Sequence, residues 1–259
     1  NGYAGIDIDW EPIEWATDVT DYRLLVTGLR TAMGNGKLLT TALPGNSTAL
    51  STVATVRDSL DQINLMTYDY SGTWPGWSTA WYNAPLYNGG RSHPQYPGIL
   101  LPAADKDVNA LNGQGVGLGK IGIGLDWYGY RWYGDASDGT PGVINTLQEY
   151  TTPPKVEGNI AYHTIMDTYY SAANRHWDST AKSAYLSIDQ AGTYNDQFIS
   201  YDDEQTSTEK IAYARQKGIG GIIIWELGGG YRPSLPSGQR DPLLQAVKAA
   251  LTGQPPPTP

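Results

Sequence analysis

Three acidic residues alternate with other residue types near the start of the chain, in the sequence GIDIDWE. Every second side chain of a β-strand points to the same face, so Asp7, Asp9 and Glu11 would form a row with steps of roughly 6 to 7 Å. Ile6 and Ile8 would pack behind this row. Neighbouring like charges raise the pKa of at least one carboxyl group, because each ionisation opposes the next. The row therefore predicts a carboxylic acid that keeps a proton near neutral pH and can give it to a leaving oxygen atom.

A metal site and an exposed edge strand are the two other interpretations of this row. The chain has only three histidines, His93, His163 and His176, and none has ligand spacing with another, which disfavours a divalent metal. The two isoleucines between the acids disfavour an exposed edge strand. We therefore expect a catalytic acid that works without a metal or a cofactor.

The composition excludes several classes of partner. The 259 residues include 26 acidic and 17 basic ones, and a net charge of −9 would repel a phosphate backbone, so we expect no nucleic acid partner. No run of about 18 apolar residues is present, so we expect no membrane partner. The absence of cysteine excludes a disulfide framework and a cysteine nucleophile. The chain has 9 Trp and 19 Tyr against 1 Phe, and rings that carry a polar group suit the half-apolar faces of sugars.

Short apolar runs alternate with amphipathic stretches along the chain, which is typical of βα units around a parallel sheet. The runs predict strands at 3–10, 37–43, 62–68, 120–125 and 220–226. Helical periodicity predicts helices at 21–33, 53–60, 103–112, 207–217 and 242–251. About 80 residues between 125 and 206 are too many for a structureless loop. They predict an inserted α+β subdomain.

The acidic segment resembles the DGxDxDxE signature of family 18 glycoside hydrolases, the chitinase family, with Ala4 at the place of the leading Asp. Three later segments resemble the family's sixth, seventh and eighth barrel strands, in that order. They are NLMTYD at 64–69, the region 122–132, and GIIIWE at 221–226. Arg131 is displaced by one position from the family's arginine, so we assign it no contact. The resemblance covers nearly the whole chain.

This resemblance implies an α/β fold, a (β/α)8 TIM barrel of which only the fourth to eighth βα units are present. The expected parts are barrel strands four to seven at 1–126, an insertion subdomain at 127–205, the last barrel units at 206–252 and a Pro/Thr linker at 253–259. A complete barrel takes about 250 residues before insertions, so we expect a missing N-terminal barrel half or its replacement by a second chain. We also expect a carbohydrate-binding module beyond the linker.

The resemblance further implies a secreted, extracellular chitinase whose partner is chitin or a chito-oligosaccharide. In this family the 2-acetamido group of the substrate assists the reaction, so no protein nucleophile is needed. Glu11 would act as general acid and then as base, Asp9 would orient the acetamido group, and Asp7 would share a proton with Asp9. Tyr68 would donate its hydroxyl proton to the acetamido carbonyl.

Further side chains are expected to bind the sugar. Trp225 would form an apolar floor beneath it, and Met66 and Asp69 would complete the wall. Other aromatic candidates fall at or beyond predicted strand ends, where barrel enzymes build their active sites. The complete set of expected substrate-binding residues is Met66, Asp69, Trp225, Tyr128, Trp10 and Trp74. For Trp77, Trp81 and Trp132 the sequence leaves open two roles, a platform for a further sugar or ordinary packing.

Two other functions remain open on the same scaffold. An endo-β-N-acetylglucosaminidase that acts on N-glycans would share the acidic motif, but such enzymes typically lack an insertion of about 80 residues. A chitin-binding lectin would keep the fold and usually lose the catalytic acid, whereas Glu11 is present here. The sequence therefore favours a chitinase.

Overall fold

The computed structural model describes residues 2–74 and 76–253, which form two compact units. The first unit contains the residues up to Thr67 together with Ala104–Gly124 and Tyr213–Ile223. The second contains Tyr68–Ala103, Leu125–Ala212 and the chain from Ile224 onward. The linker expected at 253–259 falls outside the described residues from position 254 on. No helix within the described residues is long and apolar enough to cross a membrane.

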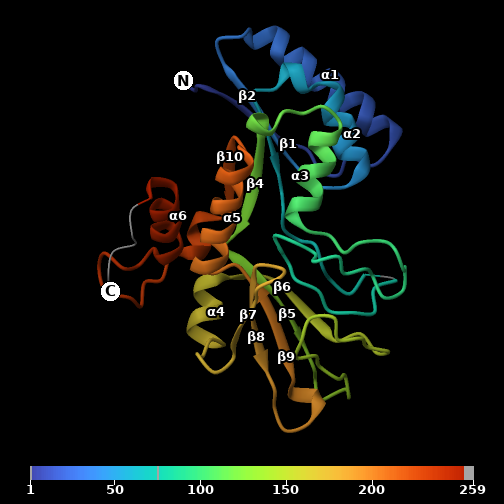
Figure 1. The fold of residues 1–259 in the computed structure, drawn as a ribbon, viewed down its shortest axis with the longest axis vertical. Helices are drawn as coiled ribbons and strands as arrows, with labels where there is room; N and C mark the ends of the chain where they lie inside the picture. Colours follow the sequence, from blue (N-terminus) through green and yellow to red (C-terminus); the bar gives the residue numbers. More distant parts are fainter. Residues whose placement is uncertain (1, 75, 254–259) are drawn as a thin grey trace. The chain divides into compact units, whose positions relative to one another are not determined.

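A five-stranded sheet with the order β1-β2-β3-β4-β10 carries the first unit, and the pairs β1–β2, β2–β3 and β3–β4 are parallel. All five strands expected from the apolar runs are present, with ends shifted by a few residues. Helices alternate with them, and α1 and α2 pack against each other (Figure 1). The elements in chain order are β1 (Gly5–Asp9), α1 (Ala16–Met33), β2 (Leu38–Leu43), α2 (Ser47–Thr55), β3 (Gln62–Leu65), α3 (Ala104–Gly113), β4 (Ile121–Asp126), α5 (Glu204–Lys217) and β10 (Gly221–Trp225).

The second helix differs most from its prediction. We expected it at 53–60, whereas α2 begins at Ser47 and ends at Thr55, before a short 3-10 turn at Arg57–Ser59. Asn46 explains the earlier start, because its side-chain oxygen accepts a hydrogen bond of 2.8 Å from the backbone N–H of Ala49. This N-cap satisfies a helix donor that has no partner within the helix.

One of the two isoleucines in the acidic segment does not pack as expected. Ile8 is buried, as predicted, but Ile6 is 44% exposed, so the prediction that both pack behind the acids is wrong for Ile6. The reason is the position of β1 at the end of the described sheet, where it has a neighbouring strand on one side only. The acidic segment is therefore an edge strand of the described sheet, contrary to our expectation.

A buried hydroxyl relay fastens this edge strand to its neighbours. The hydroxyl of Tyr22 on α1 donates a hydrogen bond of 2.9 Å to the Thr41 hydroxyl, which donates one of 2.9 Å to the backbone carbonyl of Ile8. Both side chains are fully buried, and burial raises the pKa of Tyr22 to about 12. The relay joins α1, β2 and β1 through groups that water cannot reach.

The second unit is built on an antiparallel sheet with the order β6-β5-β9-β8-β7 (Figure 1). All five strands come from the segment expected to hold an α+β insertion, and a short helix accompanies them, so the expected fold class is confirmed. The elements are β5 (Tyr128–Tyr133), β6 (Lys155–Ala161), α4 (Tyr162–Thr168), β7 (Arg175–Asp178), β8 (Ser183–Ile188), β9 (Gln197–Tyr201) and the later helix α6 (Pro242–Thr252).

Aromatic side chains fill the core of this second unit. Trp81 and Trp132 are fully buried and pack in one cluster with Tyr82 and Phe198. The Trp81 indole N–H donates a hydrogen bond of 3.0 Å to the carbonyl of Pro102. Of the two roles that the sequence left open for these tryptophans, the structure shows packing, because the inserted sheet needs large rings for its own core.

The close approach of β1 and β2 makes a testable prediction at Gly5. A Cβ atom on Gly5 would lie 2.1 Å from the carbonyl oxygen of Leu38, so Gly5→Ala must push the strands apart and should lower the free energy of unfolding by about 1 to 3 kcal/mol. A Cβ on Gly28 in α1 would meet nothing, so Gly28→Ala should raise the free energy of unfolding by about 0.5 to 1 kcal/mol. Urea unfolding of both variants measures the difference, and equal stabilities would contradict the close approach.

Candidate active site

The acidic segment lies partly on β1 and partly beyond it. Asp7 and Asp9 are both exposed and belong to the strand, which places them on one face of the sheet. The hydroxyl of Thr40, the residue opposite Asp7 on β2, donates a hydrogen bond to the Asp7 carboxylate. Glu11 is exposed and follows the strand by two residues. Two carboxylates of the predicted row, Asp7 and Asp9, therefore lie on one face of the strand, whereas Glu11 lies in the segment that follows it.

Two other candidates of the first unit lie at the carboxyl ends of parallel strands. Trp10 follows β1 and is half-buried, with its ring edge-on to Tyr22 at 6.4 Å between centroids. Met66 follows β3 and is also half-buried, and its backbone N–H donates a hydrogen bond of 2.9 Å to the carbonyl of Leu43. Both residues hold positions where barrel enzymes place active-site groups, while Trp10 also serves local packing.

Three candidates of the second unit contact one another. The rings of Tyr68 and Tyr128 meet edge-on at 5.9 Å, and both side chains are buried. The Tyr128 hydroxyl donates a hydrogen bond of 2.7 Å to the carboxylate of Asp69, which also accepts one from Tyr130. Burial, with the nearby carboxylates of Asp126 and Asp69, raises the pKa of Tyr128 well above its usual value. Tyr128 therefore keeps its proton and holds Asp69 in place.

A chain of hydrogen bonds continues from Asp69 into the core of the second unit. Asp69 has the left-handed backbone angle φ 58°, and its N–H donates a hydrogen bond of 3.1 Å to the amide oxygen of Asn83. The amide nitrogen of Asn83 donates one of 2.6 Å to the carboxyl group of Asp126, the last residue of β4. The orientation of Asp69 thus depends on a fully buried carboxyl group.

That carboxyl group belongs to a buried charged cluster of Lys210, Asp126 and Asp202. The Lys210 ammonium lies 2.5 Å from the Asp202 carboxylate and 3.5 Å from Asp126, and the three side chains are at most 2% exposed. Burial raises the pKa of both aspartates, and Asp126 well above its usual value, with the Asp202 charge as the second cause. The Oδ1 atom of Asp126 makes no hydrogen bond, and the Lys210 ammonium lies 3.5 Å from it. Burial and the Asp202 charge both favour the protonated form of Asp126, and one proton on this carboxyl group would balance the charges of the cluster.

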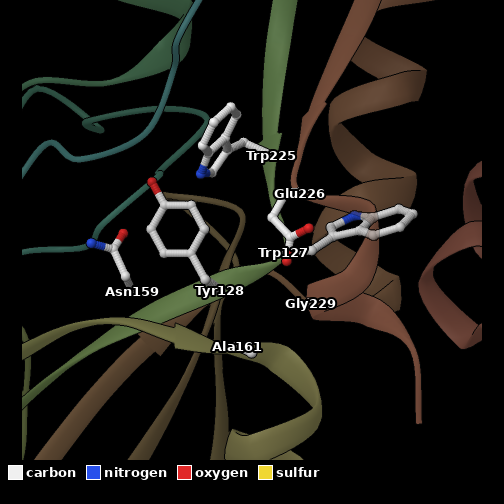
Figure 2. Close-up of a pocket in the computed structure, with 7 residues that line it drawn as sticks. All are labelled: Trp127, Tyr128, Asn159, Ala161, Trp225, Glu226 and Gly229. Atoms are coloured by element: carbon white, nitrogen blue, oxygen red, sulfur yellow. The ribbon is translucent and has the colours of Figure 1, made fainter.

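A pocket of about 110 Å³ lies in the second unit (Figure 2). It contains two of the expected residues, Tyr128 and Trp225, and Trp225 is 55% exposed. The backbone of Trp225 is fixed by a hydrogen bond of 2.8 Å from the N–H of Trp127. An exposed indole beside a phenol suits the apolar face of a sugar ring. The residues that line the pocket are Trp127, Tyr128, Asn159, Ala161, Trp225, Glu226 and Gly229.

Trp74 is not among these residues. It is 45% exposed and packs edge-on against Trp77 at 5.4 Å between ring centroids. Trp77 in turn packs edge-on against His93 at 4.9 Å, so Trp77 is partly buried support. The role of Trp74 as a sugar platform stays a prediction.

Across the described residues, no group of three or more His, Asp or Glu side chains is arranged to hold a metal ion.

Sequence reasoning missed two polar residues of the pocket, Asn159 and Glu226. The Glu226 carboxylate accepts a hydrogen bond of 3.1 Å from the N–H of Gly228 and follows Trp225 directly. Asn159 follows Gly158 inside a strand-like run, and a glycine in such a run indicates a bulge that can redirect a side chain. The glycine could be seen in the sequence, but the sequence does not show which residues of β5 pair with the bulge.

Acids at the carboxyl end of a parallel strand, as in the first unit, are typical of glycosidases built on a (β/α)8 barrel. Comparison with known proteins specifies the family. The pattern of glycosyl hydrolases family 18 matches residues 1–230, and the chain belongs to this family.

Individual relatives share this fold over part of their length. A probable endochitinase of Caenorhabditis elegans is 31% identical over 269 residues, which cover 97% of this chain and 42% of that protein. The structure of chitinase ChiA74 from Bacillus thuringiensis is similar with a TM-score of 0.73 and 28% identity, covering 100% of this chain and 45% of that one. A chitinase-like agglutinin from Robinia pseudoacacia has a TM-score of 0.67 and 25% identity, covering 96% and 68%. The chain spans 39% to 58% of the length of three curated relatives that it matches.

The position of the proton in the buried cluster can be tested with two matched variants. Asp126→Asn imitates the protonated carboxyl group, so its free energy of unfolding should stay within about 1 kcal/mol of the wild type at pH 5. Asp202→Asn removes the charged hydrogen bond to Lys210 and should cost about 1.5 to 3 kcal/mol. Urea unfolding followed by fluorescence measures both.

The pH dependence of these variants has a definite sign. The folded protein holds the Asp126 proton, which the unfolded chain releases above about pH 4. The wild type should therefore lose stability as pH rises from about 4 toward the raised pKa of Asp126, and Asp126→Asn should lose less over the same interval. The reverse order of the two variants would place the proton on Asp202 instead.

Proposed function

We propose that this chain carries the chemistry of a chitinase that cuts β-1,4-linked N-acetylglucosamine chains with retention of configuration. The observation that carries this proposal is the acidic segment of β1 in a family 18 chain, with Glu11 at its end. The 2-acetamido group of the substrate supplies the nucleophile, so the protein needs one acid and groups that orient the acetamido group.

Glu11 performs the proton transfers in this proposal. Its carboxyl proton goes to the glycosidic oxygen while that oxygen's bond to the anomeric carbon breaks. The acetamido oxygen attacks the same carbon and forms an oxazolinium ion. A water molecule then opens this ring and gives its proton to the Glu11 carboxylate, which restores the acid. Asp9 orients the acetamido N–H, and Asp7, held by Thr40, shares a proton with Asp9.

The side chains of the second unit bind the sugar. Tyr68 donates to the acetamido carbonyl, and the Tyr128–Asp69 pair supplies a fixed polar wall, supported by their 2.7 Å hydrogen bond. Trp225 offers an exposed indole face to the sugar ring. Met66, Trp10 and Trp74 complete the proposed set of contacts, with Trp74 as a platform for a further sugar unit.

The place of the chain in a larger barrel is also a proposal. The order β1-β2-β3-β4-β10 supports a correspondence with the fourth to eighth strands of a (β/α)8 barrel. The parts at 1–126, 127–205 and 206–252 then correspond to barrel strands four to seven, the insertion and the closing barrel units. We further propose that the protein is secreted, since its polymeric substrate lies outside cells.

A non-catalytic lectin is the alternative from another class, because an agglutinin shares this fold. An endo-β-N-acetylglucosaminidase for N-glycans is the alternative enzyme. Glu11 favours a hydrolase over a lectin, and the five-stranded inserted sheet favours a chitinase over an enzyme for N-glycans. Release of a fluorophore from a chitotriose glycoside separates the hydrolases from the lectin, and digestion of a glycoprotein separates the two hydrolases.

Glu11→Gln tests the proposed acid in the full-length protein. The variant keeps the size of the side chain but has no proton to give, so kcat on the chitotriose glycoside should fall by a factor of about 100 to 10,000. Binding of chitotetraose, measured by calorimetry, should change less than about threefold. Glu14→Gln is the matched control, because Glu14 is an exposed carboxylate three residues further along, and it should keep wild-type turnover.

Two outcomes would refute the assignment. Wild-type turnover in Glu11→Gln would show that another group gives the proton. A wild-type protein that binds chitotetraose and never releases the fluorophore would establish the lectin instead.

A further inference from the structure

The pairing of β5 with β6 contains an irregularity beside the pocket. Gly129 is opposite Ile160 and Arg131 is opposite Glu157. Between these two pairs β5 contributes one residue, Tyr130, whereas β6 contributes two, at positions 158 and 159. This is a β-bulge, which bends a strand locally and changes the direction of a side chain.

The two residues of the bulge suit it for different reasons. Asn159 has φ 56°, in the left-handed region that asparagine tolerates better than most side chains. Gly158 lies against the ring of Tyr130, and a Cβ atom there would be 2.7 Å from the nearest ring carbon. The Tyr130 ring thus requires a glycine at 158, and the backbone turn that follows determines where the Asn159 side chain points.

The bulge directs Asn159 to the pocket that contains Trp225 and Tyr128. Figure 2 shows the Asn159 amide beside the Tyr128 ring, with the Trp225 indole on the other side of that ring, and all three residues line the pocket. Asn159 is exposed, and within the described residues its side chain makes no hydrogen bond. A carboxamide has two donor hydrogens and an acceptor oxygen. An amide next to two aromatic rings can therefore pair with a polar substituent of a sugar that stacks on those rings.

We propose that Asn159 is a specificity-determining residue of this pocket, where its amide hydrogen-bonds a hydroxyl or acetamido substituent of the sugar unit that rests against Trp225. This inference rests on the proposed function, since it concerns the same carbohydrate ligand. A purely structural role for the amide does not fit its exposure, because removing it breaks no hydrogen bond within the described chain. The backbone role of the residue can be kept by glycine, which adopts positive φ freely.

Asn159→Gly in the full-length protein separates the amide from the backbone. When both proteins also carry Glu11→Gln, so that the ligand stays intact, the variant should bind chitotetraose about 3 to 10 times more weakly by calorimetry, the range expected for the loss of one neutral hydrogen bond. With Glu11 intact, its KM on the chitotriose glycoside should rise by a similar factor, because the amide acts through binding of the sugar. Lys182→Gly is the matched control, since Lys182 also has a left-handed φ of 55° and lies outside the pocket, and its affinity should equal the wild type.

The ligand itself identifies the recognised substituent. Loss of affinity for chitotetraose with no loss for its deacetylated form assigns the amide to an acetamido group, and equal loss for both assigns it to a hydroxyl. Equal affinity of Asn159→Gly and wild type for both ligands overturns the inference while the proposed function stands. A wild-type protein that binds neither ligand overturns the proposed function, and the inference with it.

Discussion

The need to neutralise a lysine that has no access to water organises the second unit. Lys210 on α5 is fully buried, and a buried ammonium is tolerated only with a carboxylate close by. Asp202, which follows β9, supplies the charge, and Asp126 at the end of β4, whose pKa is raised well above its usual value by burial, completes the group. Asn83 donates a hydrogen bond to Asp126, and its amide oxygen accepts one from the N–H of Asp69. The buried charged cluster is thereby linked by hydrogen bonds to Asp69, a proposed sugar-binding residue.

The parallel strands could be predicted because each is a short apolar run bounded by polar residues, and this signal is local. The start of α2 was harder to predict. It depends on the Asn46 cap, whereas the helical period that guided the prediction begins further along the chain. The strands of the inserted sheet were harder to place. In the antiparallel sheet, strands such as YGYRWY on β5 are aromatic and contain glycine, so their period is masked. Ile6 could not be assigned to the surface, since its burial depends on which strands lie beside β1.

The candidate site shows the same division between local and long-range causes. Asp7 and Asp9 share a face because strand geometry requires it, and residues just after a parallel strand lie at its carboxyl end by definition. The buried cluster and the pocket residue Asn159 have no comparable signature. The cluster joins three segments far apart in sequence, and the direction of Asn159 depends on the pairing register of β5 and β6. A register is set by the whole sheet, so no short motif can encode it.

The excess of tryptophan and tyrosine is divided between two tasks that composition alone cannot separate. Trp81 and Trp132 are buried because a small inserted sheet needs large rings to exclude water, while Trp225 and Trp74 keep about half of their surface exposed. Because the buried rings fill the core, the exposed rings are not needed there and can bind a ligand. On β5 the same face carries Trp132 in the core, Tyr130 against Gly158, and Tyr128 at the pocket. One strand face thus passes from core to binding surface, and the bulge opposite Tyr130 adds a polar amide at the end where the rings meet solvent.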